Sequence, residues 1–186
     1  MMAAADAYGR LKKYDAAVRI ARAASAKYPE STDALFRLGA SLERGGEPAE
    51  AEKVFLQLLA LRPNDAATLN YLGYMWADQG VQLERAKEML EKAVAREPRN
   101  AAYLDSLGWA YFRLGQIPDA EKNLREAYRR EPSDPTIEEH IGDLEARQGN
   151  VDGAIRHWEK ALEMKSEEPD RVREKLRRAR APVSQR

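Results

Sequence analysis

The sequence predicts an all-α fold built from tandem helix–turn–helix units. Two observations indicate this fold: a period of 34 or 35 residues shared by three residue types, and an alanine-rich hydrophobic content. Alanine favours helices that approach one another closely, whereas sheets favour β-branched and aromatic residues. Hydrophobic residues make up 44% of the 186-residue chain, which is enough for a continuous core.

The period is seen in prolines, glycines and alanines alike. Each series shows steps of 34 residues, with one step of 35 that places an extra residue at 80–83, in the turn inside the third unit. A fixed period of this length is the signature of a helical-repeat array. The members are Pro29, Pro63, Pro98 and Pro132; Gly39, Gly73, Gly108 and Gly142; and Ala17, Ala51, Ala86, Ala120 and Ala154.

The fourth unit shows why each period contains two helices. Its first helix ends at Gly115, and its second begins near Pro118 and ends before Pro132, because proline fits the first turn of a helix but not its interior. The small residues Gly108 and Ala120 allow the two helices to approach closely. Apolar residues lie at helical spacing on one face of each helix, namely Leu104, Leu107, Tyr111, Leu124 and Ala127. Asp134-Pro135 caps and opens the next unit.

These residues resemble the tetratricopeptide signature W-x₂-L-G-x₂-Y…A-x₃-F…P. Unit three, for example, has Leu69, Leu72, Gly73, Trp76, Ala86, Leu90 and Pro98. Unit five departs from the signature at Glu138, Glu145 and Ser166, and the first helix of unit one is shortened. The resemblance implies a right-handed superhelical solenoid over residues 1–168, with repeats at about 1–31, 32–65, 66–100, 101–134 and 135–168.

A further helix over residues 169–180 is expected to cap the array, followed by a frayed tail at 181–186. Residues 169–186 hold seven Lys or Arg against two acids, whereas unit five holds nine acids against four bases. We therefore expect the basic cap to dock on the acidic last repeat, as terminal repeats of solenoids need a polar outer surface.

Composition disfavours several classes of function. Lys+Arg and Asp+Glu both number 31, so the basic excess of a nucleic-acid binder is lacking. The sequence has no Cys, no membrane-spanning stretch, no targeting segment and no catalytic or phosphate-binding motif. His140 with Glu139 and Asp143 falls short of a firm metal site, which has three or four converging ligands. We predict no enzyme, no cofactor and no metal, and leave a cytoplasmic or envelope location open.

The resemblance implies a concave groove, lined by the first helix of each repeat, that holds a protein or peptide partner. Trp109 lies beside the packing stripe, so we expect an open aromatic face that anchors the partner, and little effect on folding when it is removed. The neighbouring acids favour a partner with apolar and basic residues, and His140 is expected to lie on a solvated wall. The predicted groove residues are Phe36, Asn70, Tyr74, Asp105, Trp109, Phe112, Glu139, His140 and Asp143.

The sequence thus predicts a protein–protein interaction scaffold. The alternatives are a self-assembly module and an accessory domain of a larger enzyme. A clamp for a chaperone tail is disfavoured, because Asn70 is present but the Lys and Arg that accompany it in that subgroup are replaced. Residues 69–162 resemble multi-repeat envelope proteins of bacteria.

Overall fold

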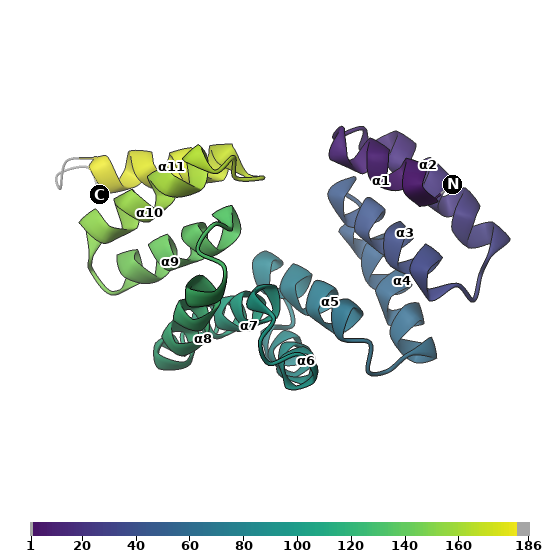
Figure 1. Cartoon of the computed structure of the whole chain (residues 1–186), viewed down its shortest axis with the longest axis horizontal. Helices are drawn as coiled ribbons and strands as arrows, with labels where there is room; N and C mark the ends of the chain where they lie inside the picture. The colour runs from purple at the N-terminus through teal and green to yellow at the C-terminus, as the bar shows by residue number, and fades with distance from the viewer. Residues whose placement is uncertain (1, 182–186) are drawn as a thin grey trace. The chain divides into compact units, whose positions relative to one another are not determined.

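The computed structural model describes residues 2–181, apart from the side chains of residues 2, 3 and 10. This part of the chain forms eleven helices and no strand, which confirms the all-α prediction (Figure 1). The helices are α1 (Met2–Arg10), α2 (Tyr14–Lys27), α3 (Thr32–Arg44), α4 (Pro48–Leu61), α5 (Ala66–Gln79), α6 (Leu83–Arg96), α7 (Ala101–Arg113), α8 (Ile117–Arg130), α9 (Pro135–Arg147), α10 (Val151–Glu163) and α11 (Pro169–Arg180). The predicted tail lies, from residue 182 onward, outside the described residues.

The chain divides into two compact units, with the boundary inside α5 between Leu72 and Gly73. Unit 1 contains α1 to α4 and the first half of α5, and unit 2 contains the second half of α5 and α6 to α11. Within unit 1, α1 packs on α2 and α3 on α4; within unit 2, α7 packs on α8 and α9 on α10 (Figure 1). Consecutive helices therefore form hairpins.

Polar side chains fix the starts of the first helices of these hairpins. Ser31 and Asn100 each accept a hydrogen bond from the backbone N–H three residues on, at 3.3 Å, before α3 and α7. Asp65 accepts from Thr68 N at 3.0 Å, and Asp134 accepts from two N–H groups at the start of α9. Each cap satisfies N–H groups that have no partner inside the helix.

A glycine in the left-handed region turns the chain between the two helices of four hairpins. These are Gly46, Gly80, Gly115 and Gly149, with φ between +73° and +86°. Glycine adopts this conformation without the steric cost that a Cβ would add. In three hairpins the second helix begins two residues after this glycine, but α6 begins three residues after Gly80. The extra residue of the period therefore lies in the turn, where the sequence places it.

The recurring helical glycines mark close approach between paired helices. A Cβ on Gly108 would lie 2.7 Å from Leu124 Cγ and 2.9 Å from Leu124 N, closer than real side chains pack. The equivalent contacts join Gly39 to Phe55, Gly73 to Leu90 and Gly142 to Trp158. Glycine is therefore required at these positions by the side chain that fills the seam between the helices.

Two apolar clusters of unit 2 are relevant to the site, one inside the array and one at α11. The first contains Leu104, Leu124, Ile137, Ile141 and Leu144, which come from three helices in succession. The second consists of Val172 and Leu176 of α11 with Ala154 and Trp158 of α10. The last helix thus covers apolar surface that α10 would otherwise expose.

Candidate partner-binding site

Helix α7 is buried on both of its faces, whereas an amphipathic surface helix is buried on one face only. Every residue from Tyr103 to Ala110 is buried. One face packs in the apolar core described above. The other face carries residues that the sequence predicts to line the partner-binding groove, and two of them, Asp105 and Trp109, are buried as well.

Aromatic rings cover the predicted binding face of α7. Trp109 stacks on the His140 ring with centroids 4.2 Å apart and on the Phe112 ring at 5.1 Å. Tyr74 lies 6.1 Å from His140 on the other side. Trp109 is only 7% exposed, so the expectation of an open aromatic face is wrong. The reason is that neighbouring first helices each contribute a ring, and the rings pack on one another.

His140 is fully buried, and the expectation of a solvated wall is also wrong. Its Nδ1 lies 2.9 and 3.0 Å from the two carboxylate oxygens of Asp105, itself 4% exposed. Burial alone would lower the pKa of His140, but the charge and hydrogen bond of Asp105 outweigh it, so that the pKa lies above its ordinary value. The imidazolium and the carboxylate therefore stabilise each other inside the unit.

Two acids beside this pair bind cations from α11. Glu139 Oε1 accepts hydrogen bonds from Arg171 Nε at 2.8 Å and from Lys175 Nζ at 2.7 Å. Lys175 Nζ also donates to Asp143 Oδ2 at 2.6 Å. Arg171 reaches further, to Asp78 on α5, at 3.2 Å. Arg171 and Lys175 lie one helical turn apart on α11, and together they hold three carboxylates from two other helices.

The pKa shifts of these acids follow from the balance of burial and charge. Burial raises the pKa of Glu139, but Arg171 and Lys175 more than offset it, and the net shift is downward. For Asp143 burial exceeds the opposing effect of Lys175, and the pKa is raised. Of these two acids, the α11 cations therefore lower the net pKa of Glu139 but not that of Asp143.

We call these eight residues of unit 2 the aromatic–acid cluster. Seven of the nine predicted groove residues belong to it, so the structure brings these seven together. Its Trp109 Nε1 and His140 Nε2 are buried and form no hydrogen bond within the described residues. The members are Tyr74, Asp78, Asp105, Trp109, Phe112, Glu139, His140 and Asp143.

The two remaining predicted residues lie in unit 1. Phe36 is half-buried, with its ring 5.8 Å from Phe55 and 5.6 Å from Tyr71. Asn70 is half-buried on α5, and its Oδ1 has no hydrogen-bond partner among the described residues.

Phe36 lines a pocket of about 430 Å³ on the first-helix face of unit 1, which we call the unit-1 pocket. Arg37 also lines this pocket and forms ion pairs with Asp6 and Asp33, which line it as well. The lining residues are Ala5, Asp6, Gly9, Tyr14, Ala17, Asp33, Phe36, Arg37, Ala40, Ser41 and Arg44. They come from α1, α2 and α3, so one hairpin and the helix that follows it build the pocket.

One position of the period separates the open face of unit 1 from the filled face of unit 2. Ala40, Tyr74 and Trp109 are 34 and 35 residues apart and follow the recurring glycine by one residue. On α5 and α7 this position carries a large ring that lies near His140, and on α9 it carries Asp143. On α3 it carries a methyl group, and a pocket lies beside it.

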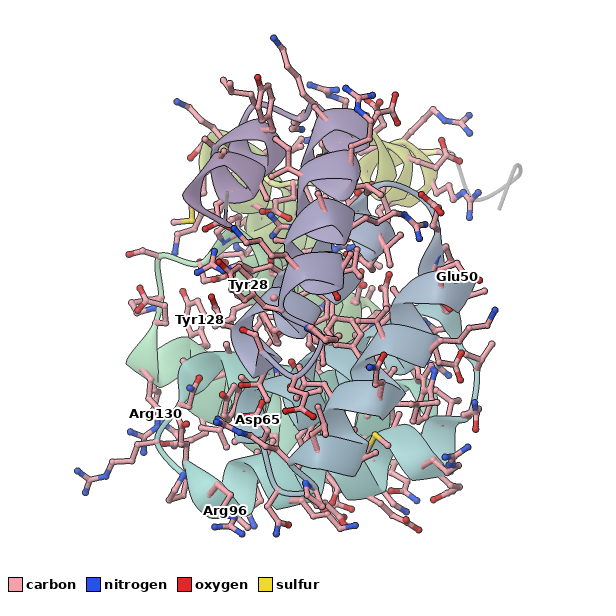
Figure 2. All side chains as sticks on the ribbon, turned by 90° about the vertical axis from the view of Figure 1, so that its right-hand side faces the viewer. Tyr28, Glu50, Asp65, Arg96, Tyr128 and Arg130 are labelled. Carbon is pink, nitrogen blue, oxygen red and sulfur yellow. The ribbon has the colours of Figure 1, made fainter. Side chains whose placement is uncertain are left out.

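Glu138 is a departure from the repeat signature that the structure explains. It is fully buried, and its Oε2 lies 2.6 Å from His157 Nδ1. Its Oε1 forms an ion pair with Lys160, although no hydrogen bond of ordinary geometry joins the two atoms. Lys160 and His157 also contact the ring of Tyr128 on α8, labelled in Figure 2. The carboxylate occupies a position that is apolar in the signature, where it pairs with Lys160 and contacts the His157 ring.

The sequence analysis did not assign Arg171 and Lys175 to the site. The opposite charges of the last helix and the last repeat indicated docking, but not which residues pair. For two other contacts of the site, the spacing in the sequence is a signal. Asp105 and His140 are 35 residues apart, which is one period, and they contact each other. Asp78 and Arg113 are also 35 residues apart, and the Arg113 guanidinium donates to the Asp78 carbonyl at 2.5 Å. Residues one period apart meet on neighbouring repeats.

Within residues 2–181 no group of three His, Cys, Asp or Glu has the geometry to hold a metal ion. In the same range, no helix has both the length and the apolar character required to cross a membrane.

Tandem hairpins with capped first helices and glycine seams define a helical-repeat protein. More specifically, the chain belongs to the tetratricopeptide repeat family, whose profile matches residues 2–66, 41–80, 82–135 and 106–169. This confirms the resemblance found in the sequence. The family fold is a scaffold for protein–protein interaction, and its members are generally not enzymes.

Similar proteins agree on the fold. A tetratricopeptide repeat-containing protein of Pseudomonas aeruginosa is 36% identical over 117 residues, which are 63% of this chain and 20% of that protein. The chain therefore spans about a fifth of the length of this relative. A thermophilic tetratricopeptide repeat protein of Thermus thermophilus is 25% identical, with a TM-score of 0.80 over 96% of both chains. MamA of Desulfovibrio magneticus has a TM-score of 0.65 at 22% identity, over 96% of this chain and 97% of MamA.

Proposed function

We propose that the chain is an interaction scaffold that binds a segment of a protein partner, extended or helical, at the unit-1 pocket. The partner places an apolar side chain beside Phe36, Tyr14 and Ala40. The observation that supports this proposal is the small residue Ala40, at a position where the third and fourth repeats have the large rings of Tyr74 and Trp109. It leaves a pocket of about 430 Å³ on the first-helix face.

The lining of the pocket suits a peptide. Binding sites for side chains are concave and mostly apolar, with a few polar groups that fix orientation. Here Phe36 and Tyr14 supply aromatic surface, and Arg37 with its two acids supplies polar groups. Aromatic residues at such places contribute much of the free energy of binding at protein interfaces.

The aromatic–acid cluster supports the same choice by contrast. Its acids already bind Arg171 and Lys175, and its rings already pack on one another. A partner that docks there has to replace these contacts, whereas a partner at the unit-1 pocket does not. We therefore propose unit 1 as the part of the chain where a partner binds without a rearrangement of the scaffold.

Filling the pocket tests the proposal. A phage-displayed library of random peptides is panned against the full chain, and the affinities of enriched peptides are measured by titration calorimetry. In the Ala40→Trp variant the new ring takes the place of the partner's side chain, because Trp109 fills the equivalent position of the fourth repeat. We expect this variant to bind the peptides at least about tenfold more weakly than the natural chain.

Leu56→Trp is the matched control, because it adds the same ring at a position on α4 that is 38% exposed and outside the pocket. This control should bind the peptides as the natural chain does. Equal affinities for the natural chain and Ala40→Trp would contradict the proposal, as would a library that yields no enriched peptide. Both variants are checked for helicity by circular dichroism, so that a loss of fold is not taken for a loss of binding.

A further inference from the structure

Helix α11 is held in place by a small apolar contact and by ion pairs. It buries two side chains, Val172 and Leu176, and partly buries Ala179, whereas α7 buries eight residues. Arg171 and Lys175 form ion pairs with acids of α5 and α9, and Arg180 forms one with Glu159 of α10. The cap residue Glu168 makes no side-chain hydrogen bond to the start of the helix. Elements with few buried apolar contacts at the end of an array open more readily than the core.

The surface beneath α11 needs cations. Among the described residues, the only ion-pair partners of Glu139 are Arg171 and Lys175, and the only one of Asp78 is Arg171. Without α11, these two acids and Asp143 would lie close together without their ion-pair partners, and His140 beside them is already paired with Asp105. Like charges at this range destabilise one another, so an occupant with two positive charges is favoured.

We propose that this surface is a second docking site, which accepts a basic amphipathic helix of a partner protein in exchange for α11. The surface consists of Asp78, Glu139 and Asp143 with Ala154 and Trp158. The occupant carries Lys or Arg at two positions one turn apart and an apolar residue after each, as α11 does with Arg171-Val172 and Lys175-Leu176. Helix α11 thus acts as an internal competitor that keeps the site closed. This site does not depend on the unit-1 pocket.

The expected occupant can be imitated by α11 itself. The probe is a fluorescein-labelled peptide of residues 166–181, and its binding to the full chain is followed by fluorescence anisotropy. The tethered helix competes at a high effective concentration, so the natural chain should bind the probe weakly. The variant Arg171→Glu/Lys175→Glu repels its own α11 from the acids and should bind the probe at least about tenfold more tightly.

Arg177→Glu/Arg178→Glu is the matched control, with the same charge change on the same helix. Both side chains are at least 75% exposed and pair only with Glu174 of their own helix among the described residues. This control should bind the probe as weakly as the natural chain. Equal probe affinity for the natural chain and Arg171→Glu/Lys175→Glu would overturn the proposal. Formation of a dimer by that variant without probe would also overturn it, because the occupant would then be a second copy.

Hydrogen exchange on the natural chain tests the proposal even if the first variant fails to fold. An isotopically labelled peptide of residues 166–181 is added in excess, so that its fragments differ in mass from those of the chain. We expect faster exchange in residues 171–180 of the chain as the peptide displaces α11, and no change in α2 to α4. A hydrogen-exchange rate of α11 that stays constant up to millimolar peptide would overturn the proposal that a partner helix replaces α11.

Discussion

Trp109→Ala is expected to destabilise unit 2, and the size of the effect follows from its surroundings. The side chain is 7% exposed and is stacked between His140 and Phe112. Replacing a buried Trp by Ala costs about 3–5 kcal/mol, which combines lost burial with the cavity that remains. The stacked geometry contributes about 0.5–1.5 kcal/mol of such a loss. No hydrogen bond is lost, since Trp109 Nε1 has none within the described residues.

The assay is urea unfolding followed by tryptophan fluorescence. All three Trp residues of the chain, Trp76, Trp109 and Trp158, lie in unit 2, so the signal reports that unit and two reporters remain in the variant. A loss of about 3 kcal/mol is a large share of the roughly 5–15 kcal/mol typical of a folded domain. We expect a clear fall in the urea midpoint with an unchanged slope.

Val81→Ala serves as the reference, because Val81 lies in unit 2, is 43% exposed, and its truncation should change the free energy of unfolding by no more than about 0.5 kcal/mol. A loss below about 1 kcal/mol for Trp109→Ala would refute the packing argument. It would instead support the expectation from the sequence, in which Trp109 lies off the core and serves only the partner.

Three further predictions concern the seams and buried charges. Gly108→Ala should cost about 1–3 kcal/mol in urea unfolding because its Cβ meets the Leu124 backbone, whereas Gly9→Ala, with no atom within 4 Å, should cost nothing. Glu138→Leu should leave thermal stability unchanged or higher, because Lys160 and His157 stay 39% and 24% exposed and remain hydrated; a fall as large as that of Glu138→Ala would contradict this. The raised pKa of His140 stabilises the fold below its ordinary value of about 6.5, and this contribution is lost as pH rises through the folded pKa. The free energy of unfolding should therefore fall with rising pH above about 6.5, and a His140→Gln chain with the same slope would disprove the assignment.

The helices and their seams could be predicted because local chemistry determines them. Asp134 before Pro135 predicts a helix start, and the structure places the N-cap there. Gly108 at the recurring position predicts close approach, and Leu124 lies against it. Each of these inferences needs only one repeat and its own period.

Whether the predicted binding face is exposed or covered could not be predicted in the same way. Whether Trp109 is open or covered depends on His140, which lies on the first helix of the next repeat, and on Phe112 on the same helix. A helical stripe separates core from surface for an isolated helix. It cannot show that the surface sides of three successive helices pack together, because that depends on side-chain volume at equivalent positions. The reach of Arg171 to Asp78, 93 residues away, is still less visible in a period of 34 or 35 residues.

Side-chain volume at one position therefore distinguishes the open face of the second repeat from the filled faces of the third and fourth repeats. A methyl group at Ala40 leaves a pocket, while rings at Tyr74 and Trp109 fill the same face of the following repeats. Because the backbone tolerates both, a single substitution should convert one state into the other: Ala40→Trp closes unit 1, and it does so without a new charge or a lost glycine. The filled face of unit 2 is stable for a different reason, since it pairs every acid of the cluster with a cation or a buried histidine. Under the two proposals, partner choice in unit 1 depends on shape, and exchange at α11 depends on charge.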